Sequence, residues 1–347
     1  MVKTFLVIFI FYSSVEAQSL RMSFSGLPER PAVTFAIKSA ETSIKKLCAE
    51  ILGGCADIEP VHLEFVDEGI SVDDVSYAGF IFYDTNTIRI SLRSEDLSRT
   101  TFHELVHWIH YHYLKDDSIL PWFRETVVFL AELCFYERPK ITTVEKRYLT
   151  SHLEGSLVFN ELSSSWYSLV KLWSRYLYSH LEEPKKLLFN WLTISKFPDV
   201  WMTQLSFESY KFLGEATKIL SHHQKSFENL FFYFIIALHA DNPRLDQWKL
   251  YSLGLPYDQR LVYVQNRFLQ LTSGACIILK PFEFFVANSD VLEANELKGN
   301  SIRAILWNEA RAPIDILNKR ISAVDVARNK IIVFNPSLQN KKLCIEP

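Results

Sequence analysis

The sequence predicts an α+β protein, built from a small mixed sheet with helices, a helical lobe and a smaller β-rich C-terminal region. β-rich segments with alternating apolar residues occur at 61–66, 77–84 and 86–92. Between about 120 and 250 the pattern is mainly helical and rich in Trp, Phe and Tyr. From about 259 onward, short β-branched runs separated by Asn, Gly and Pro predict strands.

The first seventeen residues have the pattern of a secretory signal peptide. Lys3 precedes an apolar run from Phe5 to Tyr12, and Val15-Glu16-Ala17 suits cleavage before Gln18. The alternative is a buried first strand or helix. The longest later apolar run, Leu230 to Leu238, is too short to span a membrane and suits a core helix. We therefore expect a secreted or periplasmic protein without membrane insertion.

The elements of the N-terminal lobe follow in order. Apolar residues from about Ala32 to Leu52 have helical spacing, which ends at Gly53-Gly54. A strand is expected at Val61 to Val66, and segments 77–84 and 86–92 predict a hairpin with a turn at Asp84 to Asn86. The expected divisions are a signal peptide at 1–17, a sheet-and-helix lobe at 18–115, a helical lobe at 116–255 and a β-rich domain at 256–347.

Charge and cysteine usage limit the classes of partner and compartment. The formal net charge is -3 and no long basic run is present, so we expect no nucleic acid or anionic membrane as a partner. The five cysteines contain no Cys-x-x-Cys pair. Export would permit a bridge from Cys48 to Cys55, and at least one thiol must stay free or pair between chains.

The segment Thr100-Thr101-Phe102-His103-Glu104-Leu105-Val106-His107-Trp108-Ile109 carries the clearest chemical signal. On a helix, His103 and His107 lie on one face and can bind one ion, while Glu104 is rotated by about 100° and can reach a water molecule. The pattern arises by chance in only about 0.02 chains of this composition. Its bulky, uncharged flanks predict a buried helix. The alternative is two core histidines beside an exposed glutamate.

A catalytic zinc site usually takes three protein ligands. A third histidine six residues after His107 is excluded, because Tyr113 stands there. Glu125 is the expected third ligand: it lies eighteen residues after His107 on a helix that begins at Pro121. Two antiparallel helices joined by Lys115 to Leu120 could bring Glu125 against the histidine pair.

Three further polar residues lie near the motif in the sequence: Glu132, His110 and His112. Glu132, two turns beyond Glu125, either orients a ligating histidine from behind or is an ordinary polar helix position. His110 and His112 are expected to be packing or surface groups outside the site.

These residues resemble the gluzincin metallopeptidases, the superfamily of thermolysin and the aminopeptidase N type enzymes. The resemblance covers roughly residues 35 to 180 and is most specific at the histidine motif and at Trp122-Phe123-Arg124-Glu125. Arg124 and Thr126 depart from the Asn and Gly usual in the aminopeptidase branch, and its Gly-x-Met-Glu-Asn segment is absent. The resemblance implies a zincin-like catalytic domain, in which an edge strand above the metal pairs with an extended substrate.

A looser match concerns Trp166 to Leu177, which is similar to the superfamily's helix that opens with a catalytic tyrosine. The resemblance makes Tyr167 the candidate phenol, which would hydrogen-bond the oxyanion; the alternative is a packing residue at a helix start.

The expected activity is that of a zinc metallopeptidase acting on a peptide or protein. Zn²⁺ would be held by His103, His107 and Glu125, with Glu104 as general base. Two alternatives stay open: a non-catalytic zinc-containing binding protein, and a metallohydrolase that cleaves a non-peptide bond.

Overall fold

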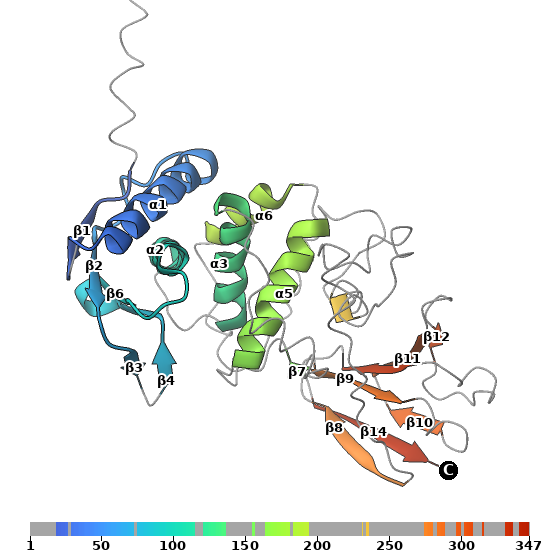
Figure 1. Cartoon of the computed structure of the whole chain (residues 1–347). Helices are drawn as coiled ribbons and strands as arrows, with labels where there is room; N and C mark the ends of the chain where they lie inside the picture. Colours follow the sequence, from blue (N-terminus) through green and yellow to red (C-terminus); the bar gives the residue numbers. More distant parts are fainter. Residues whose placement is uncertain are drawn as a thin grey trace, which may run out of the picture. The chain divides into compact units, whose positions relative to one another are not determined.

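The computed structural model describes residues 19–26, 29–72, 75–114, 121–136, 155–156, 164–180, 183–193, 231, 234–235, 274–279, 283–288, 296–299, 302–307, 314–315, 330–335 and 340–346. These residues form a mixture of helices and sheets, which confirms the predicted α+β class (Figure 1). The expected signal peptide lies outside the described residues.

The chain divides into two compact units. The first contains Met1–Ser118, Val127–Pro139 and Glu183–Phe197, and the second contains Ile119–Thr126, Lys140–Glu182 and Pro198–Pro347. The boundary between Thr126 and Val127 falls inside one continuous helix, α3 (Pro121–Phe135).

The main sheet of the first unit has the order β1-β2-β6-β5. Its strands are β1 (Met22–Ser25), β2 (Val61–Val66), β5 (Gly79–Phe82) and β6 (Thr87–Ser91). β1, β2 and β6 are parallel to one another, while β5 pairs antiparallel with β6 and forms an edge of the sheet. A separate hairpin joins β3 (Ile70–Val72) and β4 (Val75–Tyr77).

The predicted strand and turn signals of this sheet are confirmed. β2 has the predicted bounds, and its apolar residues Val61, Leu63 and Phe65 are buried in alternation with partly exposed positions. Between β5 and β6, a short 3₁₀ turn (η3, Tyr83–Thr85) ends at Asn86, whose φ of 50° is left-handed. Asn tolerates this conformation better than most residues, which explains why the chain can reverse there.

Helix α1 (Pro31–Leu47) continues into a π-helical turn, η2 (Cys48–Leu52), and stops at Gly53 with a φ of 69°. This agrees with the predicted helix and its glycine end. A disulfide joins Cys48 to Cys55 just beyond the stop, as the sequence permitted. The buried face of α1 packs against helix α2 (Leu97–Leu114).

Helix α2 lies against strands β5 and β6. Its start is fixed by Asp96, whose side chain accepts a 2.9 Å hydrogen bond from the Arg99 backbone N–H. The apolar flanks of the histidine motif are buried as predicted: Phe102, Leu105, Val106, Trp108 and Ile109. The motif therefore lies on a helix fixed on several sides.

Helices α3 and α6 (Pro184–Leu192) both begin at a proline, which suits the first helical position because it lacks an N–H to satisfy. Residues 115–120, the expected connection between α2 and α3, lie outside the described residues.

The second unit contains helix α5 (Ser164–His180) and two antiparallel sheets. The three-stranded sheet has the order β10-β14-β8, with β8 (Cys276–Leu279), β10 (Glu296–Gly299) and β14 (Lys341–Glu346). The five-stranded sheet has the order β12-β11-β13-β9-β7, with β7 (Gly155–Ser156), β9 (Glu283–Asn288), β11 (Arg303–Trp307), β12 (Ile314–Asp315) and β13 (Lys330–Phe334). The strands expected from the β-branched runs are thus present.

The core of the second unit is aromatic. The Phe231 ring contacts Trp173 of α5 as well as Phe284 and Phe334 of the five-stranded sheet. All four side chains are buried. A second disulfide, Cys276–Cys344, joins β8 to β14, and Cys134 keeps a free thiol. Among the described residues, no helix has both the length and the apolar character needed to cross a membrane.

Candidate metal centre

The two motif histidines face each other one turn apart on α2. The Nε2 atoms of His103 and His107 lie 3.2 Å apart. This follows from the four-residue spacing, which places the side chains on one helix face. His107 is buried, and the His103 side chain is 16% exposed.

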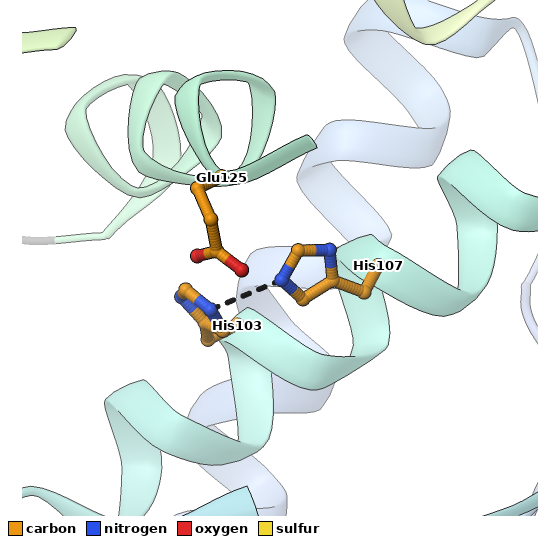
Figure 2. A group of neighbouring side chains, drawn as sticks. All are labelled: His103, His107 and Glu125. Carbon is orange, nitrogen blue, oxygen red and sulfur yellow. Dashed lines mark hydrogen bonds between the residues drawn. The ribbon is translucent and has the colours of Figure 1, made fainter. Parts of the chain in front are cut away.

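Glu125 completes the group from α3. Its carboxylate points from that helix toward the two imidazoles (Figure 2). One ligand atom from each of His103, His107 and Glu125 lies within 4.8 Å of the others, and Glu125 is buried. The structure therefore brings together the three residues that the sequence predicted as metal ligands.

The donor set fits zinc in chemistry and in spacing. Zn²⁺ binds imidazole nitrogen and carboxylate oxygen at about 2.0–2.2 Å, usually with tetrahedral geometry. Two nitrogens at about 2.05 Å from a tetrahedral centre lie about 3.3 Å apart. The 3.2 Å between the two Nε2 atoms is close to this value. The site thus has the separation that binding requires at its two nitrogen ligands.

The carboxylate of Glu132 contacts His103, and the guanidinium of Arg99 contacts that carboxylate. Glu132, on α3, lies 2.8 Å from His103 Nδ1. The other carboxylate oxygen accepts hydrogen bonds from Arg99 Nε at 2.7 Å and Nη2 at 2.6 Å. Glu132 is therefore not an ordinary polar helix position, because its side chain is only 2% exposed and contacts a proposed ligand.

The charge state of Glu132 determines which nitrogen of His103 is available. Burial alone would raise the pKa of Glu132, but the charges and hydrogen bonds of Arg99 and His103 outweigh it, and the pKa is lowered. An ionised carboxylate only accepts hydrogen bonds, so Nδ1 of His103 carries the proton. In the neutral form of this tautomer the lone pair is on Nε2, the atom that lies beside His107 Nε2, and a metal could bind it there.

Glu104 lies on another side of α2, next to the edge strand β5. Its buried side chain comes so close to Gly79 that a Cβ built on that glycine would lie 2.6 Å from Glu104 Oε1. The carboxylate is therefore at the sheet edge, where the predicted hairpin strand lies. This placement agrees with the expectation that Glu104 is not a metal ligand, since the candidate ligand group does not include it.

The remaining candidates are placed as follows. His110 is buried and His112 is half-buried, and neither belongs to the ligand group found among the described residues. Tyr167 lies in the first turn of α5, half-buried, with its ring edge-to-face against Trp166. Its catalytic role stays a prediction.

Sequence reasoning missed two residues of this site. Arg99 had a signal, because Arg99, His103 and His107 repeat every four residues and so share a face of α2. Gly79 had none, because its contact with Glu104 depends on how β5 packs against α2.

Comparison of the sequence with protein-family models gives no match, and a search of curated proteins finds no similar chain. The function proposed below therefore rests on the side chains of α2 and α3 and on the contact of Glu104 with Gly79 of β5.

Proposed function

We propose that this chain is a zinc-dependent peptidase that hydrolyses peptide bonds with an activated water molecule. One observation carries the proposal: the His103, Glu104, His107 motif lies on a buried helix, and Glu125 from a second helix joins the two histidines within 4.8 Å. A structural zinc would more often be closed by four protein ligands, whereas three leave a position for water.

The fold around the motif supports a zincin-like catalytic domain of the gluzincin type. Helix α2 packs against a mixed sheet whose antiparallel edge strand, β5, runs beside Glu104. An exposed edge can bind an extended peptide through backbone hydrogen bonds. Glu132 behind His103 also agrees with this assignment, because carboxylates commonly orient zinc-bound histidines.

In the proposed reaction, His103, His107 and Glu125 hold the ion. Bound zinc lowers the pKa of water and polarises a carbonyl. Glu104 takes a proton from the water molecule as its oxygen attacks the peptide carbon, and then gives that proton to the amine released when the C–N bond breaks. The resemblance would give Tyr167 the role of donating a hydrogen bond to the oxyanion.

The substrate in this proposal is a peptide or protein outside the cytoplasm. Two disulfides, Cys48–Cys55 and Cys276–Cys344, favour an oxidising compartment. They support the secreted or periplasmic location expected from residues 1–17.

The proposal is tested with the purified full-length chain. We expect about one zinc per chain, and we expect cleavage of a peptide library, with products identified by mass spectrometry. A chelator should abolish the cleavage, and added zinc should restore it. Glu104→Gln should retain the zinc and lower the cleavage rate by about 10²- to 10⁴-fold, as expected when a general base is removed.

Three results would contradict the proposal. A wild-type protein that binds no zinc lacks the proposed centre. A Glu104→Gln protein with full activity does not use this base. Zinc binding without any peptide cleavage would favour the binding-protein alternative, or hydrolysis of a different bond.

A further inference from the structure

Gly79 is the first residue of edge strand β5, where it pairs with Ile90 of β6. Its φ is not in the left-handed region, unlike that of Gly26, Gly53, Gly54 or Gly274. The backbone conformation at position 79 is thus open to any L-amino acid. A reason for glycine must come from the surroundings of the residue.

The three atoms nearest to a Cβ at this position all belong to one side chain, that of Glu104. A Cβ on Gly79 would lie 2.6 Å from Glu104 Cγ, 2.6 Å from Oε1 and 2.8 Å from Cδ. Non-bonded carbon atoms normally approach to about 3.5–4.0 Å. All three atoms belong to the Glu104 side chain, so an added methyl group would press directly on this side chain.

We propose that Gly79 is a positioning residue for the reaction, and that its missing side chain provides the space in which the Glu104 carboxylate lies. The inference rests on the proposed function for what that carboxylate does. It adds that the position of the base is set by the shape of β5, since Glu104 is buried and has little room to take another position.

A side chain added at position 79 is expected to affect the proposed base, Glu104, and not the metal ligands. Gly79→Ala should move the carboxylate away from its working position while leaving the ligand group intact, because none of the three nearest atoms belongs to His103, His107 or Glu125. A displacement of about 1 Å in a catalytic group can cost roughly 100-fold in rate. We expect kcat on a peptide substrate to fall by about that factor, with zinc content unchanged.

The chain offers a matched control in Gly69. It is exposed, its φ is not left-handed, and a Cβ there would meet no atom within 4 Å. Gly69→Ala should therefore keep the wild-type rate. The substrate for all variants is a fluorescence-quenched peptide built on a sequence that the wild-type enzyme cleaves in the library experiment.

Two double-mutant cycles separate positioning from a general structural effect. With Glu104→Gln already present, Gly79→Ala should cause little further loss of rate, because the displaced group no longer acts as a base.

The second cycle measures stability by urea unfolding and needs no activity. Glu104→Ala removes Cγ, Cδ and Oε1, so Gly79→Ala should destabilise the wild-type protein but not the Glu104→Ala protein. Without a clash, replacing glycine by alanine in a compatible conformation usually stabilises a protein.

The outcomes for Gly79 and for the proposed function are distinguishable. If Glu104→Gln abolishes cleavage but Gly79→Ala cleaves at the wild-type rate, the positioning role is wrong and the peptidase proposal stands. Equal effects of Gly79→Ala on stability in both Glu104 backgrounds would also overturn the role. If Glu104→Gln is fully active, the peptidase mechanism fails, whereas the stability cycle still tests the contact.

Discussion

Two sides of helix α2 hold adjacent residues in different ways. On the side facing α3, His103 is fixed by a chain of charged hydrogen bonds through Glu132 to Arg99. On the side facing β5, Glu104 lies where Gly79 leaves room for it. The comparison teaches that a metal ligand and a base need different support: a ligand needs a fixed tautomer and ring orientation, and a base needs a fixed position.

The largest expected effect is on zinc affinity, and it should differ between Glu125→Gln and Glu104→Gln, the same substitution on the two sides of α2. Glu125→Gln removes a ligand charge from the α3 side, and the loss of zinc affinity should exceed the roughly 10- to 100-fold loss typical of an outer partner. Glu104→Gln should keep wild-type zinc affinity. Competition with a chromophoric zinc chelator measures both. Equal losses for the two variants would contradict the division between ligand and base.

The Arg99 variant tests the charged support through stability. Arg99→Gln leaves the carboxylate of Glu132 buried without its strongest charge partner, and the free energy of unfolding should fall by about 3 kcal/mol. Urea unfolding of the zinc-free protein measures this effect without a contribution from metal binding. A loss below about 0.5 kcal/mol, as for an ordinary surface site, would show that Arg99 gives no support.

The ion pair of Arg99 and Glu132 also predicts how the stability of the fold depends on acid pH. Because the pKa of Glu132 is lowered in the folded state, its contribution is fully present above the unfolded value of about 4.3 and is lost as the pH falls through the folded pKa. Arg99→Gln raises the folded pKa, so acid unfolding should begin at a higher pH. An unchanged unfolding curve by circular dichroism would rule out this linkage.

Removing the carboxylate itself should have a smaller effect on metal binding. Glu132→Gln keeps the shape of the side chain but loses the charge that fixes Nδ1–H on His103, so zinc affinity should fall by about 10- to 100-fold. Gly79→Ala should leave zinc affinity unchanged and thus serves as the matched variant from the other side of α2. A loss of affinity in Gly79→Ala would show that the two sides are coupled.

The smallest effect concerns the free thiol of Cys134, two residues after Glu132 on α3. Burial raises the pKa of this thiol to about 12, so at pH 8 almost none of it is thiolate and alkylation by iodoacetamide should be slow. Labelling should become faster in Arg99→Gln if α3 loosens, and should not change in Gly79→Ala. Rapid labelling of the wild type would contradict the raised pKa of the half-buried Cys134 thiol.

Much of the site follows from local patterns. The four-residue spacing of His103 and His107 and the proline that opens α3 are sufficient to predict the ligand helices, because helix geometry is a property of neighbouring residues. The alternation of apolar residues predicts the strand at Val61 to Val66. For Cys48 and Cys55 the sequence only permits a bridge, and the structure contains it. The pairing of Cys276 with Cys344, 68 residues apart, was not predicted.

The sequence by itself determined which residues carry the candidate chemistry and which elements hold them. Only the tertiary structure decided how the elements meet: that Arg99 reaches Glu132 and that Gly79 lies against Glu104. The physical reason is that spacing along a helix is set by its own hydrogen bonds. A contact between segments distant in the chain is set by how whole faces pack, and no local pattern encodes it.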